Sequence, residues 1–290
     1  MKKSDNQIFS ESYLVNSYFL NLLGLQAFRY ISASLVYWLR GIFFKWDNSK
    51  EVKILKKEGL LIINNFLNME DFEKFRDHFK SLQNIGLNKI LNDGDSSTER
   101  STLSIEQIEN NEILTKIVCS KKLINILESC EHKKFIKNRF HNFGKYGQIV
   151  WLDKINNIGF TSIKDSQKTL HSDIFFHTHK VWYFPSEVNA QSGPLNFVKG
   201  SHKFSFKRMY LEYINSIDER TNTQSPNIRN NKQPLNNYEK NSTICNVSAN
   251  TLVIANTRGY HKRGNSFQGT SRMQLHFRVR RNPFEKIFIQ

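Results

Sequence analysis

The sequence has few cysteines, and the three that it has, Cys119, Cys130 and Cys245, are widely spaced. No CxxC pair occurs, so the chain lacks the pattern of a zinc knuckle, and an odd number of cysteines does not indicate a disulfide framework. A reducing compartment is the simplest setting for such a chain, and we expect it to be cytoplasmic.

Long uninterrupted apolar runs are also absent. Polar residues follow Met1-Lys2-Lys3 where a secretory signal peptide would have its apolar region. Residues 13–44 are largely apolar, but polar residues interrupt them, among them Asn16, Asn21, Gln26, Arg29 and Arg40. A transmembrane helix has about 20 consecutive, predominantly apolar residues, so we do not expect this stretch to span a bilayer.

Acidic residues are scarce relative to basic ones. The chain has 26 Asp and Glu against 42 Lys and Arg, which gives a formal net charge of +16. Such a balance attracts anions: a phosphorylated or carboxylated substrate, an anionic membrane surface or nucleic acid. Charge alone does not choose among these, and a generally basic solvated surface is an equal alternative.

The apolar residues of the N-terminal stretch predict an amphipathic helix. They recur at spacings of three, four or seven, which places them on one face: Leu14, Tyr18, Leu22, Leu25, Phe28, Leu35, Leu39 and Ile42. Because most amphipathic helices bury their apolar face, we expect this face to pack on the rest of the protein. The alternative is peripheral contact with a membrane or a partner through residues 13–44.

A second unit begins near Val52 and mixes strands with helices. Gly59 to Ile63 has strand character, and Asn68 is placed to cap the helix that follows. Residues 88–102 are polar and contain glycine, so we expect a loop there. Residues 104–129 indicate one or two helices.

After Gly147 the pattern changes to short β-rich stretches bounded by turn residues, at 148–152, 180–184, 195–198, 251–254 and 273–279. Residues 218–242 have few apolar side chains and predict a long exposed loop. The sum is an α+β protein whose second half could close into a barrel or a sandwich. We divide the chain into an N-terminal amphipathic helical segment, 1–48, and a domain, 49–290, in which 49–146 supports a β-rich core over 147–284.

The triplet His171-Ser172-Asp173 carries the chemistry. Alternate side chains of a strand point to the same face, so His171 and Asp173 can address one ion together. His261, just after the predicted strand 251–254, can supply a third ligand. Two imidazoles and one carboxylate leave open positions on the metal, which suits non-haem iron(II), whereas structural zinc closes its shell with four ligands. An HxD triplet alone is weak evidence, because such triplets arise by chance.

The surrounding sequence strengthens this interpretation. Leu170 to Asp173, Lys180 to Phe184 and Ser192 to Lys203, which reads SGPLNFVKGSHK, together resemble the phytanoyl-CoA dioxygenase family. In that family an HxD strand is followed by a GSH-containing turn, a distal metal histidine and then an arginine. Here Arg272 stands eleven positions after His261.

The resemblance covers roughly residues 50–284 and implies a double-stranded β-helix (jelly-roll, cupin-like) core, with the N-terminal helices packed on or beside it. It implies that His171, Asp173 and His261 form the catalytic centre and bind Fe(II), with 2-oxoglutarate and O2 as cosubstrates. Arg272 would bind the far carboxylate of 2-oxoglutarate, for which a planar guanidinium group is suited.

Other candidates are weaker. The family often places cosubstrate contacts on the strand after the HxD triplet, here at Lys180 and Trp182, although a surface lysine and a core tryptophan are equal alternatives. His202 belongs to the GSH turn, and we expect it to be structural. Candidates for binding an anionic substrate, with solvated loop positions as the alternative, are His177, Arg258 and Arg263.

We therefore expect an Fe(II)- and 2-oxoglutarate-dependent dioxygenase that hydroxylates or otherwise oxidises a C–H bond of a small or amphiphilic, anionic substrate, releasing succinate and CO2. A non-catalytic metal-binding scaffold or sensor is the alternative. Nucleic-acid demethylases share the HxD…H triad, but their C-terminal arginine pattern does not match residues 272–278, so we expect no nucleic-acid partner. Halogenases replace the carboxylate ligand by a small residue, and Asp173 argues against that chemistry. Substrate identity and oligomeric state stay open.

Overall fold

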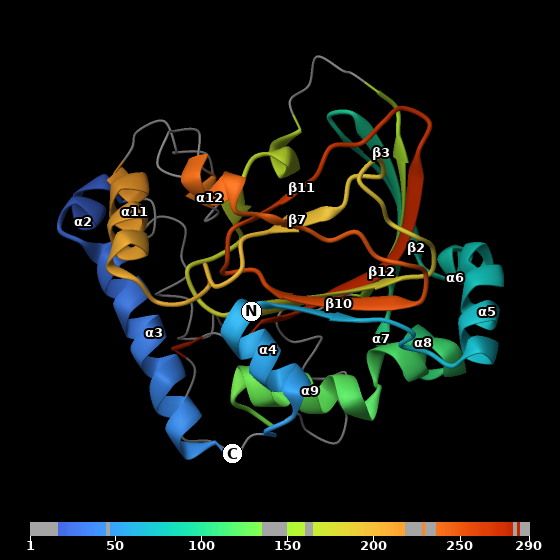
Figure 1. The fold of residues 1–290 in the computed structure, drawn as a ribbon, viewed down its shortest axis with the longest axis horizontal. Coiled ribbons are helices and arrows are strands. Elements are labelled where there is room, and N and C mark those ends of the chain that lie inside the picture. Colours follow the sequence, from blue (N-terminus) through green and yellow to red (C-terminus); the bar gives the residue numbers. More distant parts are fainter. Residues whose placement is uncertain are drawn as a thin grey trace, which may run out of the picture.

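The structure is a computed structural model that describes residues 17–44, 47–134, 150–159, 165–217, 228–229, 236–280 and 283–284. Figure 1 shows two β-sheets, one above the other, with helices below and beside them. The helices are α2 (Tyr18–Leu22), α3 (Leu25–Phe43), α4 (Lys50–Glu58), α5 (Met69–Asp77), α6 (Phe79–Ile85), α7 (Ile105–Glu109), α8 (Glu112–Val118), α9 (Lys121–Glu131), the 3-10 helix η2 (Ser166–Lys168), α11 (Phe206–Ile217) and α12 (Asn236–Lys240). The strands are β1 (Leu60–Ile63), β2 (Leu87–Asp93), β3 (Ser96–Leu103), β4 (Val150–Asn157), β5 (His171–Ser172), β6 (Thr178–Phe184), β7 (Leu195–Phe197), β8 (Ile228–Arg229), β9 (Thr243–Ile244), β10 (Thr251–Asn256), β11 (His261–Arg263) and β12 (Ser271–Arg280).

The described strands form two antiparallel sheets. One has the order β1-β10-β6-β12-β4-β3-β2 and the other has the order β8-β5-β11-β7-β9. The inner faces of the two sheets share a hydrophobic cluster, to which Leu60 and Val253 contribute from the first sheet and Phe197 from the second. The architecture is the α+β jelly-roll that the sequence predicted, with the helices packed on and beside it.

A larger core lies on the outer face of the first sheet. Strand alternation sends one set of side chains to each face, so Leu275 and Phe277 of β12 point outward together with Val181 of β6. They meet the apolar faces of the covering helices, which contribute Phe75, Leu114, Leu123 and Leu127, among others. α5 begins where the sequence predicted, because the Asn68 side chain accepts a hydrogen bond from the Asp71 amide at 2.8 Å.

The loop expected over residues 88–102 is wrong, because these residues form the hairpin β2–β3. β3 pairs with β4 along its whole length and buries small polar residues, Ser96, Thr98 and Ser101. A hydrophobicity pattern cannot detect a strand whose buried positions are hydroxyl side chains. The Gly94-Asp95 turn, with Gly94 at φ 58°, is the local signal that could have identified it. In the long loop predicted over 218–242, residues 218–227 and 230–235 lie outside the described residues, while β8 and α12 lie within it.

The N-terminal helix is present, but the side that it turns inward is the opposite of the one expected. Phe28, Leu35 and Ile42 of the predicted apolar face are exposed, whereas Arg29 and Arg40 are buried. The expectation that the apolar face packs on the core is therefore wrong for α3. No helix among the described residues is long and apolar enough to cross a membrane.

The turn around Gly200, Ser201 and His202 fastens α4 and β1 to the second sheet. The Gly200 amide donates to the Glu58 carbonyl oxygen at 2.7 Å, and His202 Nε2 donates to the Lys56 carbonyl oxygen at 3.1 Å. These bonds satisfy carbonyl groups at the C-terminal end of α4. Gly59 follows with φ 77°, and a Cβ atom there would collide with the His202 ring. His202 is structural, as expected.

Burial lowers the pKa of His202 from 6.5 to about 4. Between these values the unfolded chain binds a proton that the folded chain does not, so stability falls as pH drops through this window, by up to about 1.4 kcal/mol per pH unit for this residue. We expect His202→Gln to flatten the dependence of the free energy of unfolding on pH between 6.5 and 4, measured by urea denaturation in the presence of a chelator. The exposed His78→Gln is the control, and parallel curves for His202→Gln and wild type would contradict the assignment.

Candidate metal centre

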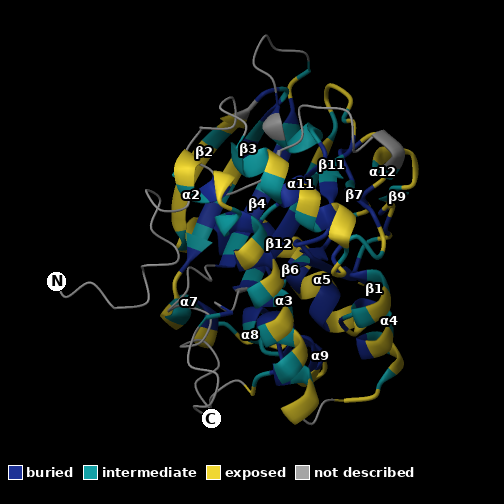
Figure 2. Ribbon diagram, turned by 90° about the vertical axis from the view of Figure 1, so that its left-hand side faces the viewer, coloured by how far each residue is buried: buried dark blue, intermediate teal, exposed yellow. Residues whose placement is uncertain are grey.

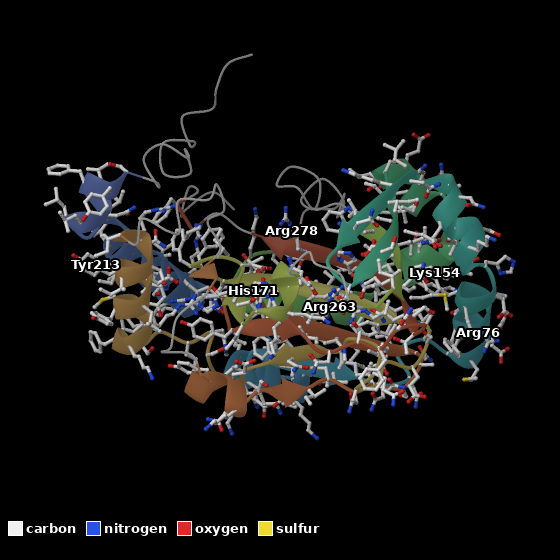
Figure 3. The ribbon with its side chains drawn as sticks, turned by 90° about the horizontal axis from the view of Figure 1, so that it is seen from above. Arg76, Lys154, His171, Tyr213, Arg263 and Arg278 are labelled. Atoms are coloured by element: carbon white, nitrogen blue, oxygen red, sulfur yellow. The ribbon has the colours of Figure 1, made fainter. Side chains whose placement is uncertain are left out.

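The centre is formed where β5 and β11 pair. The register places His261 directly opposite His171, with a ring-centroid distance of 4.5 Å. His261 lies opposite the core residue Phe197 on β7 as well, so its side chain points into the space between the sheets. Both imidazoles are buried. In the view from above, His171 lies in the middle of the molecule, between Tyr213 of α11 and Arg76 of α5 (Figure 3).

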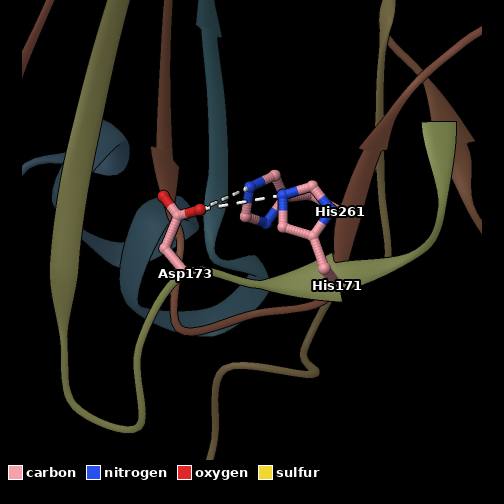
Figure 4. A group of neighbouring side chains, drawn as sticks. All are labelled: His171, Asp173 and His261. Carbon is pink, nitrogen blue, oxygen red and sulfur yellow. Dashed lines mark ion pairs between the residues drawn. The ribbon is translucent and has the colours of Figure 1, made fainter. Parts of the chain in front are cut away.

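Asp173 completes the group immediately after β5. Its Oδ1 lies 3.7 Å from His171 Nε2 and 3.6 Å from His261 Nε2 (Figure 4). The three ligand atoms lie within 4.8 Å of one another, and no other such group of His, Cys, Asp or Glu is found in the described part of the chain. The backbone amide of Asp173 donates to the Thr257 carbonyl oxygen at 3.0 Å, which holds the residue against the segment leading to His261.

Backbone carbonyl groups fix the tautomer of both histidines. His171 Nδ1 lies 2.8 Å from the Thr169 carbonyl oxygen, and His261 Nδ1 lies 2.9 Å from that of Gly259. A carbonyl oxygen only accepts, so each Nδ1 carries a hydrogen, and Nε2 is the ring nitrogen that faces Asp173 and is left to bind a metal. This arrangement of the outer ring nitrogen is usual for histidines that bind metals.

Burial and the neighbouring His261 lower the pKa of His171 from 6.5 to about 3. Burial alone would raise the pKa of Asp173, but Lys180 and His261 outweigh it and hold that pKa well below its usual range. At neutral pH the site therefore presents a neutral His171 and an ionised Asp173. These are the protonation states that a metal cation requires of its ligands.

Lys180 and Trp182 lie on β6, on the face that points between the sheets. Lys180 Nζ lies 2.7 Å from Asp173 Oδ2, so it binds the carboxylate oxygen that faces away from the histidines. Trp182 packs against the inner hydrophobic cluster. Lys180 thus contacts a candidate metal ligand, Asp173. That Lys180 or Trp182 contacts a cosubstrate stays a prediction.

Arg272 and Arg263 lie close enough for the charge of Arg263 to lower the pKa of Arg272, but their surroundings differ. Arg263 pairs with Asp95 and Asp165. Arg272 donates to the Gly193 carbonyl oxygen and takes part in no ion pair among the described residues. Burial and Arg263 lower its pKa to about 10, which leaves it cationic at neutral pH. Arg272 is therefore the better placed of the two to receive an anion.

His177 and Arg258 lie beneath α3. Arg258 is 1% exposed, its Nη2 donates to Ser34 Oγ at 2.7 Å, and its Nη1 lies 2.9 Å from His177 Nε2. Its guanidinium also lies over the Tyr30 ring. These contacts favour a role in holding α3, and a role of either residue in binding substrate stays an untested prediction.

Two polar networks around the site were not predicted from the sequence. Arg208 of α11 donates to Ser172 Oγ at 2.6 Å, between two of the candidate ligands, and pairs with Glu212 at 2.8 Å. On the inner face of the first sheet, Asp153 accepts from Arg100 at 2.8 Å and from His276 Nε2 at 2.8 Å. Alternation of polar and apolar residues over 272–279 is the signal that could have identified the second network.

No protein-family model and no curated protein matches the chain. Among solved structures, HygX from Streptomyces hygroscopicus with nickel and 2-oxoglutarate bound is similar at 12% identity and a TM-score of 0.48, over 80% of this chain and 86% of that one. The epimerase SnoN, in complex with Fe3+, alpha ketoglutarate and nogalamycin RO, is similar at 10% identity and a TM-score of 0.53. That match covers 79% of this chain and 81% of SnoN, and it shows that the two proteins share a fold.

Proposed function

We propose that the protein is an iron(II)- and 2-oxoglutarate-dependent dioxygenase that oxidises a C–H bond of a small or amphiphilic, anionic substrate. In a hydroxylation, one atom of O2 enters the product and the other enters succinate, as 2-oxoglutarate loses CO2. The observation that carries the proposal is the convergence of His171 Nε2, His261 Nε2 and Asp173 Oδ1 within 4.8 Å of one another. Two histidines and one carboxylate with open positions are typical of non-haem iron(II) oxygenases.

Two further observations support it. The chain shares its fold with SnoN, whose structure contains Fe3+ and alpha ketoglutarate. The HxD strand β5 and the strand β7, which leads into the GSH turn, resemble the phytanoyl-CoA dioxygenase family in sequence, and they flank β11, the strand of His261, in one sheet. We place the protein in or near that family.

The residues of the chain take distinct roles in this proposal. His171, His261 and Asp173 would hold iron(II), which together with bound 2-oxoglutarate supplies the oxidising chemistry with O2. Lys180 orients Asp173 by holding its second oxygen at 2.7 Å. Arg272 would bind the far carboxylate of 2-oxoglutarate, since its guanidinium has a buried nitrogen without a protein partner.

We expect Asp173→Ala to weaken Fe(II) binding by more than about 100-fold, beyond the ~10–100-fold typical for loss of a residue that only supports a ligand. The variant loses the anionic ligand and keeps only the two imidazoles. Anaerobic titration with Fe(II) and 2-oxoglutarate, followed by the weak visible charge-transfer band of the chelate, measures the effect. Asp173→Glu, which keeps the charge, should retain part of the affinity, and the surface variant Asp77→Ala should retain all of it. Unchanged affinity in a folded Asp173→Ala protein would reject the centre.

We expect Arg272→Ala to weaken 2-oxoglutarate binding by at least about 30-fold, the equivalent of ~2 kcal/mol for a lost buried charge-assisted pair. Fe(II) affinity should not change, because Arg272 is not a ligand in this proposal. Isothermal titration of 2-oxoglutarate into the metal-loaded protein measures the first effect, and anaerobic titration of Fe(II) into the metal-free protein measures the second. Arg278→Ala, on the same face of β12, is the matched control. A wild-type protein that binds Fe(II) but not 2-oxoglutarate would favour the metal-binding scaffold or sensor instead.

A further inference from the structure

The outward face of α3 is an apolar stripe. Phe28, Ile31, Leu35, Trp38 and Ile42 follow one another at helical spacings of three and four, and all are exposed, with Phe28 at 62% and Trp38 at 61%. A solvent-facing helix normally shows the reverse, with its polar residues outside. Contiguous exposed apolar surface of this kind marks an interaction site.

The polar residues of α3 explain why the stripe cannot turn inward. Arg29 Nη1 donates to Gln26 Oε1 at 2.8 Å, and Gln26 Nε2 donates to Glu212 of α11 at 3.0 Å. Farther along, Arg40 Nη2 donates to the Pro283 carbonyl oxygen at 3.0 Å. Rotating the helix to bury its apolar side would break these bonds and leave buried polar groups unpaired, so the orientation is fixed by the protein itself.

The apolar surface continues onto α11. Phe206 is 75% exposed and Tyr210 is 60% exposed. The Tyr213 hydroxyl donates to the Leu22 carbonyl oxygen at 3.2 Å, which ties α11 to α2. Figure 2 shows exposed positions along both α3 and α11 on the side that faces the viewer. The three helices α2, α3 and α11 therefore form one surface, which we name the apolar face.

The charges of the apolar face select its partner. Residues 17–44 contain no Asp or Glu, and Glu212 of α11 is buried and paired with Arg208. Lys203, just before α11, and Lys207, in its first turn, are exposed, and Lys207 Nζ lies over the Tyr238 ring. A second copy of the chain would bring only cations and apolar groups from these helices, whereas anionic lipid headgroups complement Lys203 and Lys207. Trp38 and Tyr210 are residues of the kind that concentrate at the interface between lipid and water.

We propose that the apolar face docks on an anionic membrane surface, with α3 lying in the interface and its stripe against the acyl chains. Docking on a membrane would also affect access to the candidate metal centre, a consequence that rests on the proposed function. Arg208 of α11 binds Ser172, between His171 and Asp173, so docking would bring the candidate metal centre close to the lipid. An amphiphilic substrate could then reach the centre from the membrane.

Vesicle flotation of the full chain tests the proposal, with vesicles of phosphatidylcholine alone and of phosphatidylcholine mixed with phosphatidylglycerol. We expect binding to the mixed vesicles, weakened by salt because screening reduces the attraction of the lysines. Leu35→Asn/Trp38→Asn should reduce the partition coefficient at least about tenfold, since two apolar side chains no longer leave water. Lys203→Glu/Lys207→Glu should remove the preference for the anionic vesicles.

The matched control is Leu87→Asn/Ile90→Asn, which changes two apolar residues on β2 that are at least as exposed, and it should bind vesicles like wild type. Absence of binding to the anionic vesicles, or equal binding by wild type and Leu35→Asn/Trp38→Asn, would overturn the proposal. A dimer in sedimentation that this variant abolishes, without vesicle binding, would overturn it in favour of self-association. Fe(II) and 2-oxoglutarate titrations of the same variants report on the metal centre separately, so either proposal can fail alone.

Discussion

The pairing of β5 with β11 is the constraint on which the candidate centre depends. The two-residue strand β5 and the three-residue strand β11 set His171 opposite His261, and no further adjustment of the backbone is required to bring the two Nε2 atoms toward one carboxylate. Asp173 lies beyond the end of β5, so its position comes from the bond between its amide and Thr257. One segment, residues 257–261, thus positions both the carboxylate and the second histidine.

Strands of two or three residues form few hydrogen bonds to the strands beside them, so contacts with neighbouring side chains are needed to hold them in place. Ser172, the residue between His171 and Asp173, receives a hydrogen bond from the buried guanidinium of Arg208, whose charge Glu212 balances. Removing one member of such a buried pair typically costs 3–5 kcal/mol, because the other charge is left uncompensated. The helix α11 therefore does more than cover the site: its charge pair connects the ligand strand to α3 through Gln26.

The parts of the fold that rest on local apolar periodicity could be predicted from the sequence. The strands β6, β10 and β12 lie where short β-rich stretches bounded by turn residues indicated them, and the helix α5 begins where a capping residue indicated it. The hairpin β2–β3 could not be found in this way, because Ser96, Thr98 and Ser101 fill its buried positions. The grouping of His171, Asp173 and His261 followed from motif spacing, whereas Arg208 lies in a helix with no motif, and only the folded chain brings it to Ser172. Likewise, sequence could not separate Arg263 from Arg272, because the difference lies in Asp95 and Asp165, which reach Arg263 from distant parts of the chain.

The orientation of α3 could not be predicted from the sequence either, because it depends on contacts with distant parts of the chain. Its sequence shows two faces, but which face is buried depends on the surface that it meets. That surface has an apolar part, where Phe175 and Phe176 meet Tyr30 and Ala33, but it is otherwise polar. It presents Glu212 to Gln26, the Arg258 guanidinium to Ser34 and Tyr30, and the Cys130 carbonyl oxygen to the Tyr37 hydroxyl at 2.9 Å. Burying an aliphatic stripe against these groups would remove one polar partner from each of them, at roughly 1–3 kcal/mol for a neutral group left unpaired and more for a charged one. The helix therefore satisfies the buried polar groups beside the candidate metal strand, and its apolar residues are left facing outward. The apolar face and the polar support of the centre are consequently two results of one packing arrangement.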